Sequence, residues 1–203
     1  MVIGGFRLIR RIDQGAFSEV WEATDTRTDG PKVALKVYCP ERFPADRRLV
    51  AALRFWRGAG AMQRLRGREG IVTILEGPSV AEAGTFAYIW FTMPLVEGGD
   101  LGRALDVGQL SEDQRLLIFE STCRAIRSAH AHRVVHRDVR PPNVLLTGDP
   151  SSAALLIDFD LAYYDGAFAK RHSTVGFEGA SRYLPPDLLK AAPEQQKVLF
   201  RRA

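Results

Sequence analysis

The chain of 203 residues has few cysteines and no long apolar run. Its two cysteines, Cys39 and Cys123, are far apart and lack the spacing of a metal site, which indicates a reducing cytosol. No stretch approaches the ~20 apolar residues that span a bilayer, and the first residues lack the pattern of a signal peptide. We therefore expect a cytoplasmic protein without a membrane segment.

Lysine is also scarce, because only five of the 28 basic residues are Lys and the rest are Arg. A lysine inside an apolar run therefore stands out, and Lys36 lies in such a run, 33–38. With 46% hydrophobic and 26% charged residues, the composition is that of a globular protein, which excludes disordered, collagen-like and coiled-coil classes. The abundance of Arg and Ala favours a bacterial origin.

Positive charge is concentrated in residues 41–70, where eight Arg stand against Glu41, Asp46 and Glu69, a balance of 8 − 3 = +5. Such a stretch can bind an acidic partner, but a solvated helix face is the favoured interpretation. No zinc-finger spacing or alternation of basic and aromatic residues accompanies it. We expect no nucleic-acid function.

Apolar periodicity and turn residues predict a small antiparallel sheet with one helix, followed by a mainly helical part. Ser111 and Gln114 form a capping box at the start of a helix. The expected elements are three strands within 6–38, a helix over 44–66 interrupted by Gly58 and Gly60, strands at 71–75 and 86–93, short strands at 144–146 and 155–157, and a long loop over 160–182. The fold class is therefore α+β.

The run His136–Asn143 carries the most specific chemistry in the sequence. It places the carboxylate of Asp138 and the carboxamide of Asn143 five residues apart, in a loop between apolar segments. Asp158 follows the next apolar segment. Oxygen-bearing side chains of this kind suit a site where Mg²⁺ meets phosphate oxygens.

The motifs, taken in order, resemble those of the eukaryotic-type (Hanks-type) protein serine/threonine kinase family, from about Phe6 to Asp187. The matching segments are a Gly-rich loop at 15–20, a lysine strand at 33–36, a gatekeeper and hinge at 93–96, a catalytic loop at 136–143, a metal-binding triplet at 158–160 and the end of an activation segment at 183–187. The resemblance implies a two-lobed protein-kinase-like fold with ATP and Mg²⁺, or Mn²⁺, as cofactors.

The implied division is an N-lobe at 1–93, a hinge at 94–99 and a partial, mainly helical C-lobe at 100–203. Compared with the family, the chain stops soon after the activation segment. We therefore expect marginal stability, self-association or a partner chain that completes the C-lobe. A protein substrate or a regulatory protein is the expected binding partner.

The resemblance also implies roles for single residues. Asp138 would accept the proton of the acceptor hydroxyl, Arg140 would contact the γ-phosphate, and Lys36 would hold the α- and β-phosphates. Asn143 and Asp158 would bind the metal. The implied nucleotide-binding residues are Lys36 with Ile12, Gly15, Val20, Ala34, Met93, Pro94, Val96 and Leu145. Arg137, Ser173 and Thr174 are the implied regulatory residues.

Several positions depart from the family pattern. Asp13 and Ser18 replace two glycines of the Gly-rich loop, and the helix glutamate that should pair with Lys36 falls on Gly58, or on Ala59 in a shifted register. Asp160 replaces the glycine of the metal-binding triplet, where it would add a metal ligand or point to solvent. Ala180 stands where a threonine is usual. Another acid substituting for the helix glutamate also remains open.

These departures leave three hypotheses. The first is a protein serine/threonine kinase, with impaired activity as the favoured variant. The second is a pseudokinase that acts as a nucleotide-binding or interaction module. The third is a small-molecule phosphotransferase, a class that carries a similar Ile-Asp-Phe-Asp run.

Overall fold

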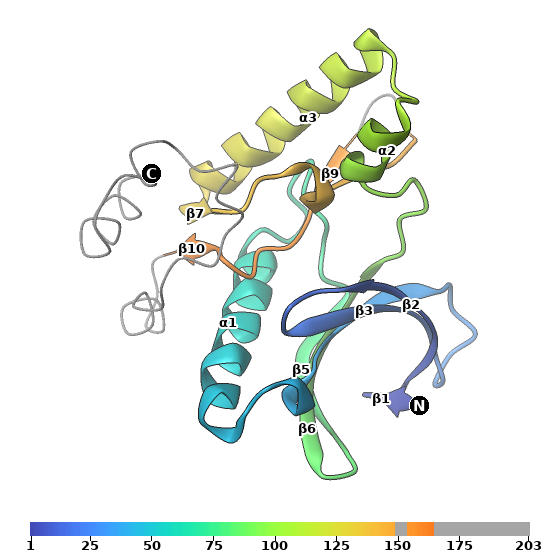
Figure 1. Ribbon diagram of the computed structural model, residues 1–203, viewed down its shortest axis with the longest axis vertical. Coiled ribbons are helices and arrows are strands. Elements are labelled where there is room, and N and C mark those ends of the chain that lie inside the picture. The colour runs from blue at the N-terminus through green and yellow to red at the C-terminus, as the bar shows by residue number, and fades with distance from the viewer. Residues whose placement is uncertain (149–153, 165–203) are drawn as a thin grey trace.

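A computed structural model describes residues 1–148 and 154–164 of the chain (Figure 1). In these ranges a twisted sheet and one helix form the N-terminal part, and helices with short strands form the rest (Figure 1). Within the same ranges, no helix combines the length and apolar character needed to cross a membrane. The predicted α+β class is confirmed, with an antiparallel sheet and one helix in the N-terminal part and a mainly helical second part.

The N-terminal sheet is antiparallel throughout, in the order β1-β2-β3-β4-β6-β5. Its strands are β1 (Val2–Ile3), β2 (Phe6–Gln14), β3 (Ser18–Asp25), β4 (Val33–Tyr38), β5 (Glu76–Ala83) and β6 (Phe86–Pro94). The strand β4 lies between β3 and β6 and is buried along its whole length. Its central position explains why it reads as a nearly continuous apolar run with a single lysine.

The two faces of β4 contribute to different cores. Leu35 and Val37 pack with the cluster around Phe6 and Trp90, whereas Ala34 packs with the cluster beneath the helix α1 (Ala45–Arg64). Because side chains alternate along a strand, Lys36 lies on the same face as Ala34. The sheet therefore directs the ammonium of Lys36 toward α1 and the second half of the chain.

The second half begins after β6 and contains two helices. Asp100 caps α2 (Leu101–Val107) by accepting a hydrogen bond from the backbone of Arg103. The predicted capping box is confirmed at α3 (Glu112–Ala131), where Ser111 and Gln114 bond each other's backbone N–H groups. The remaining elements are the strands β7 (Val134–Val135), β8 (Val144–Leu146), β9 (Ala154–Leu156) and β10 (Tyr163–Tyr164), with short 3₁₀ turns at Pro40–Arg42 and Pro141–Asn143.

One predicted strand is wrong. Residues 71–75 form a connection outside the sheet in which Ile71, Val72 and Ile74 are buried and Leu75 is exposed, and the edge strand β5 begins only at Glu76. Ile71, Val72 and Ile74 are apolar because they pack in the core beneath α1, not because they lie in the sheet. The true strand is partly exposed and contains Gly77 and small or acidic residues, so its pattern is weak.

Candidate active site

Lys36 is almost completely buried and is held by two carboxylates. Its Nζ atom lies 2.8 Å from Oδ1 of Asp158 and 2.8 Å from Oδ2 of Asp160. The side chain of Lys36 is 7% exposed, and its ammonium lies 5.9 Å from the ring centre of Phe55 on α1. A buried ammonium is costly unless it is paired, so the two carboxylates account for the lysine in the core.

The charges of this cluster determine one another's ionisation. Burial opposes the charged form of Lys36, but the carboxylates of Asp158 and Asp160 outweigh it and raise the pKa of the ammonium above its ordinary value. Burial also opposes ionisation of Asp158, yet the nearby Lys36 lowers the pKa of this carboxyl. For Asp160, burial and the charge of Asp158 together raise the pKa. Asp158 is therefore the more firmly ionised of the two acids.

The loop that follows β7 brings the predicted catalytic residues together. The amide nitrogen of Asn143 donates to the backbone carbonyl of Asp138 at 2.8 Å and to Oδ2 of the same residue at 2.9 Å. Arg140 forms an ion pair with the same carboxylate, with its Nε 3.3 Å from Oδ2 of Asp138. The backbone of Ile157 donates to the carbonyl of Asn143, which sets Asp158 beside this loop.

His136 connects the loop to the segment after β9. Its Nε2 lies 2.8 Å from the carbonyl of Ile157, and the backbone N–H of Asp138 donates to its Nδ1 at 3.2 Å. Both bonds form only in the neutral ring protonated at Nε2. Burial lowers the pKa of His136, in agreement with a neutral ring. The ring also packs against Phe159 with 4.4 Å between centroids.

Two residues of the site have left-handed backbone conformations, which residues other than glycine rarely adopt. Arg137 has φ of 68° and Asp158 has φ of 63°. Such conformations cost about 1–3 kcal/mol each and persist only where the surroundings enforce them. Arg137 is the neighbour of His136, and Asp158 belongs to the Lys36 cluster. The surrounding contacts therefore hold both strained residues at the site.

Asp160 does not point to solvent, which excludes one of the two alternatives for this residue. The residue is 7% exposed and bonds Lys36 from the side of α1. Gly58 of α1 lies against it, since a Cβ atom at Gly58 would stand 2.7 Å from Oδ1 of Asp160 and 2.9 Å from its Cα. Gly58 is therefore the helix position that faces the lysine cluster, as the register without a shift predicted.

The residues implied to bind a nucleotide occupy neighbouring strands and the connections between them. Ala34 pairs with Met93 across β4 and β6, and Val20 pairs with Lys36 across β3 and β4. Ile12 and Val20 are partly buried against the core that contains Ala34 and Met93. The other implied residues are Pro94 at the end of β6, Val96 in the connection after it, Gly15 in the turn between β2 and β3, and Leu145 in β8.

The turn between β2 and β3 is held by contacts that the sequence did not indicate. The backbone N–H of Gly15 donates to the carbonyl of Ser18 at 2.9 Å. Arg42 donates to the carbonyl of Gly15 at 3.0 Å and pairs with Glu19, which Arg11 also contacts at 3.1 Å. These bonds fix the tip of the hairpin although Gly15 is the only glycine in it.

Arg137, the first of the implied regulatory residues, packs its guanidinium 4.5 Å from the ring centre of Tyr163. Burial lowers the pKa of Arg137 to about 10. Ser173 and Thr174 lie outside the described residues, as do Ala180 and most of the predicted loop. The structure therefore places only the arginine of this group.

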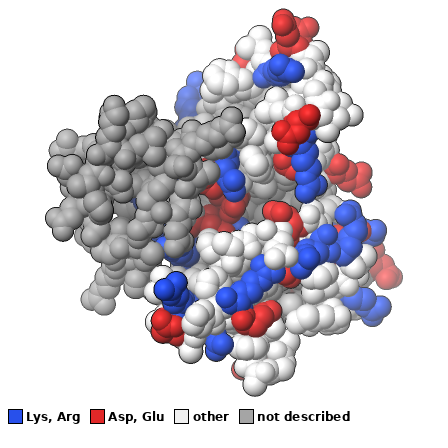
Figure 2. Space-filling view, in the orientation of Figure 1, with Lys and Arg blue, Asp and Glu red and all other residues white. Residues whose placement is uncertain are grey.

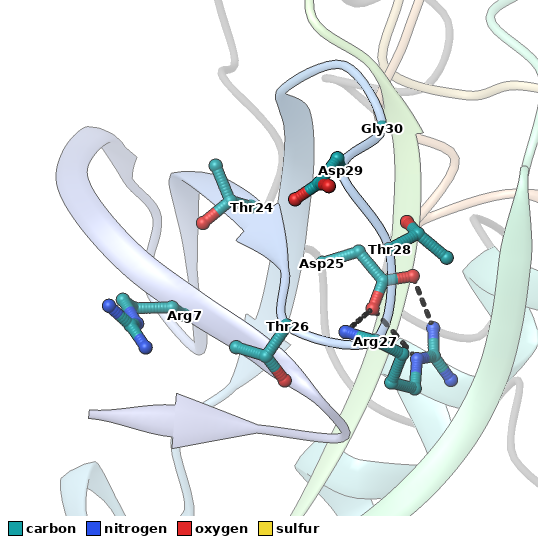
Figure 3. A pocket seen from close by; sticks show the side chains of 8 residues that line it. All are labelled: Arg7, Thr24, Asp25, Thr26, Arg27, Thr28, Asp29 and Gly30. Atoms are coloured by element: carbon teal, nitrogen blue, oxygen red, sulfur yellow. Dashed lines mark hydrogen bonds and ion pairs between the residues drawn. The ribbon is translucent and has the colours of Figure 1, made fainter.

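A separate hollow of about 560 Å³ lies at the far end of β3 (Figure 3). Arg27, which lines it, bonds Asp25 in the same lining at 2.8 Å and Glu76 of β5 at 2.6 Å. Val20, not this end of β3, pairs with Lys36. The hollow is therefore distinct from the lysine cluster. It is lined by Arg7, Thr24, Asp25, Thr26, Arg27, Thr28, Asp29 and Gly30.

Charge on the viewed face is mixed, with acidic and basic side chains beside one another (Figure 2).

Several arginines of the basic stretch 41–70 donate hydrogen bonds to backbone carbonyls. Arg48 donates to the carbonyls of Pro40 and Phe43, and Arg64 donates to that of His132. These contacts favour a structural role for the stretch over a partner-binding one.

Comparison with known proteins identifies the family. Residues 6–199 match the protein kinase domain. The serine/threonine-protein kinase PknA of Mycobacterium tuberculosis is 35% identical over 185 residues, which are 91% of this chain and 41% of PknA. CBL-interacting protein kinase 22 of Oryza sativa subsp. japonica is 30% identical over 206 residues, covering 92% of this chain and 43% of that kinase. The chain thus spans less than half the length of these relatives. With the domain match covering most of its length, the chain belongs to the protein kinase family.

Proposed function

We propose that the chain is a protein serine/threonine kinase domain that transfers the γ-phosphate of ATP to a protein hydroxyl with the help of Mg²⁺. In this proposal residues 1–93 are the N-lobe, 94–99 the hinge and 100–203 the part of the C-lobe that the chain contains. The observation that carries the proposal is the convergence of Asp138, Asn143, Asp158 and Lys36 on one site. The relatives named above support the choice of protein as acceptor.

The side chains present fit a magnesium ion. Asn143 uses its amide nitrogen on Asp138, which leaves its carbonyl oxygen for a metal. Asp158 contacts Lys36 through Oδ1, and its side chain remains 34% exposed. Mg²⁺ is usually bound by one or two protein oxygens together with substrate phosphates, so this pair is sufficient. When bound, the ion would neutralise charge on the phosphate oxygens.

Asp138 is suited to act on the acceptor hydroxyl. Its carboxylate is fixed by Asn143 and Arg140, so it can accept a hydrogen bond from the hydroxyl and take its proton. The hydroxyl oxygen then forms a bond to the γ-phosphorus while the bond to the β-phosphate oxygen breaks and ADP leaves. Arg140, beside this carboxylate, would contact the transferred phosphoryl group.

The nucleotide would lie against the sheet. Ile12, Val20, Ala34, Met93 and Leu145 would enclose the adenine ring, and Gly15 would approach the phosphates. The carbonyl of Pro94 and the N–H of Val96 would bond the adenine edge, which suits a proline because only its carbonyl is used. Lys36 would bind the α- and β-phosphates.

Phosphate transfer from radiolabelled ATP to generic protein acceptors tests the proposal, with Asp138→Asn as the matched control. We expect transfer that needs Mg²⁺ or Mn²⁺ and is lost in the variant. No Asp138-dependent transfer at any metal concentration would overturn the enzyme proposal. A thermal shift with ATP would then distinguish a nucleotide-binding pseudokinase from a module that binds none. Transfer to an alcohol or antibiotic, but never to protein, would favour the small-molecule phosphotransferase.

A further inference from the structure

The lysine cluster contains an acid that the family pattern does not supply. In that pattern the lysine pairs with a glutamate on the helix, and the third residue of the metal-binding triplet is glycine. In this chain both positions are exchanged, because the helix carries Gly58 and the triplet ends in Asp160. The two exchanged residues lie against each other in the structure.

The contacts show why the exchange is complementary. A Cβ atom at Gly58 would lie 2.7 Å from Oδ1 of Asp160 and 2.9 Å from its Cα, both closer than real side chains allow. The absence of a side chain on α1 thus opens the space that the Asp160 carboxylate occupies. From there, Oδ2 of Asp160 reaches Nζ of Lys36 at 2.8 Å.

We propose that Asp160 is a positioning residue that holds Lys36 in place of the missing helix acid, with Gly58 providing its room. The proposal rests on the proposed kinase function for its catalytic consequence. Asp160 does not need to touch the nucleotide. It fixes the ammonium that does so, and it leaves the exposed part of Asp158 to the metal.

Compared with the family pattern, this arrangement changes which part of the chain fixes the position of Lys36. Both of its carboxylate partners belong to the short segment 158–160, and neither belongs to α1. Displacement of the segment 158–160 would break both bonds, whereas α1 supplies neither carboxylate and meets Asp160 at Gly58. Regulation of Lys36 would act through that segment.

The first test is a double-mutant cycle on stability, which needs no nucleotide. Asp160→Asn and Lys36→Met are combined, and unfolding in urea is measured for all four proteins. We expect Asp160→Asn to lower the urea midpoint in the wild type but to leave it unchanged or raise it in the Lys36→Met background, where the acid has lost its partner. Equal effects of Asp160→Asn in both backgrounds would overturn the proposal.

The second test separates positioning from simple loss of structure. Steady-state kinetics with varied ATP are measured for Asp160→Asn, and for Asp25→Asn as a control. Asp25 is also an acid paired with a basic side chain, with Oδ1 2.8 Å from Nε of Arg27, but it lies at the end of β3 away from Val20 and Lys36. We expect kcat/KM for ATP to fall about tenfold or more in Asp160→Asn and to change less than about twofold in the control. Equal losses in both would contradict a positioning role.

Reversing the exchange gives a rescue experiment. Gly58→Glu alone should be severely impaired, since the new side chain collides with Asp160. The double variant Gly58→Glu/Asp160→Gly removes the collision with the carboxylate but keeps the close approach to Cα of residue 160, so it should recover only part of the lost kcat/KM. A Gly58→Glu variant with wild-type kcat/KM would contradict the inference.

Failure of the proposed function would be recognised separately. Wild-type protein that transfers no phosphate, together with a strongly non-additive cycle of Lys36 and Asp160, would overturn the kinase activity and retain the pairing. Active wild-type protein with an additive cycle would retain the activity and overturn the pairing.

Discussion

Acidification should destabilise the fold through His136. This ring is buried and neutral, with Nε2 bonded to the carbonyl of Ile157 and Nδ1 to the N–H of Asp138. A proton added to Nδ1 would remove the second bond and leave a buried charge. Because the folded pKa lies below the ordinary value of 6.5, the unfolded state binds the proton more readily. The stabilising contribution is therefore present above pH 6.5 and decreases as the pH falls below it.

The size of the effect follows from one proton. While the buried ring stays neutral, each pH unit below the unfolded pKa lowers the free energy of unfolding by about 1.4 kcal/mol. Between about pH 7.5 and about pH 5.5 the loss from this group amounts to at most roughly 1.4 kcal/mol, because the unfolded histidine is mostly neutral over the first unit.

Urea denaturation at the two pH values measures this loss, with His136→Phe as the comparison. The variant keeps an aromatic ring against Phe159 but has no titrating group. Other titrating groups remain in both proteins, so the difference between the two pH dependences isolates the histidine. We expect the wild type to lose more than the variant on acidification, by up to roughly 1.4 kcal/mol. Equal pH dependences, or a smaller loss in the wild type, would refute a buried neutral ring.

Three further predictions concern packing, capping and metal. Phe159→Ala removes a ring with 0% exposure and should lower the free energy of unfolding by about 3–5 kcal/mol in urea titrations, and a loss under about 1 kcal/mol would contradict its place in the core. Ser111→Ala removes the hydroxyl that accepts from Gln114 and should cost about 1 kcal/mol in thermal unfolding, whereas an unchanged melting temperature would argue against the cap. Asn143→Ala should raise the Mg²⁺ concentration needed for half-maximal transfer, and it should lower kcat because Asp138 loses a hydrogen bond that fixes its carboxylate. EDTA should abolish transfer by the wild type. An unchanged Mg²⁺ requirement in Asn143→Ala would show that Asn143 is not a metal ligand.

Elements with strong local signals could be predicted from the sequence. The capping box marked the start of α3, and the apolar run with Lys36 marked the central strand β4. Residues 71–75 were predicted as a strand because buried extended segments look alike whether or not they pair in a sheet. The true edge strand β5 lacked an apolar pattern, since its neighbour β6 and not its own side chains holds it in place.

The site, like the fold, could be predicted only in part from the sequence. The order of motifs predicted which residues would meet, and the structure brings Lys36, Asp138, Asn143 and Asp158 to one place. The partner of Lys36 could not be selected from the sequence, because Gly58 and Asp160 are far apart along the chain. Taken alone, each looks like the loss of a residue that the family pattern requires. Only their contact in space shows that the two departures fit each other.

Phosphoamino-acid analysis of a protein acceptor after incubation with radiolabelled ATP and Mg²⁺ tests the central claim most directly. The proposed function predicts phosphoserine or phosphothreonine with the wild-type chain and neither with Asp138→Asn. Label that never enters a protein hydroxyl, or that enters equally with the Asp138→Asn variant, would contradict it.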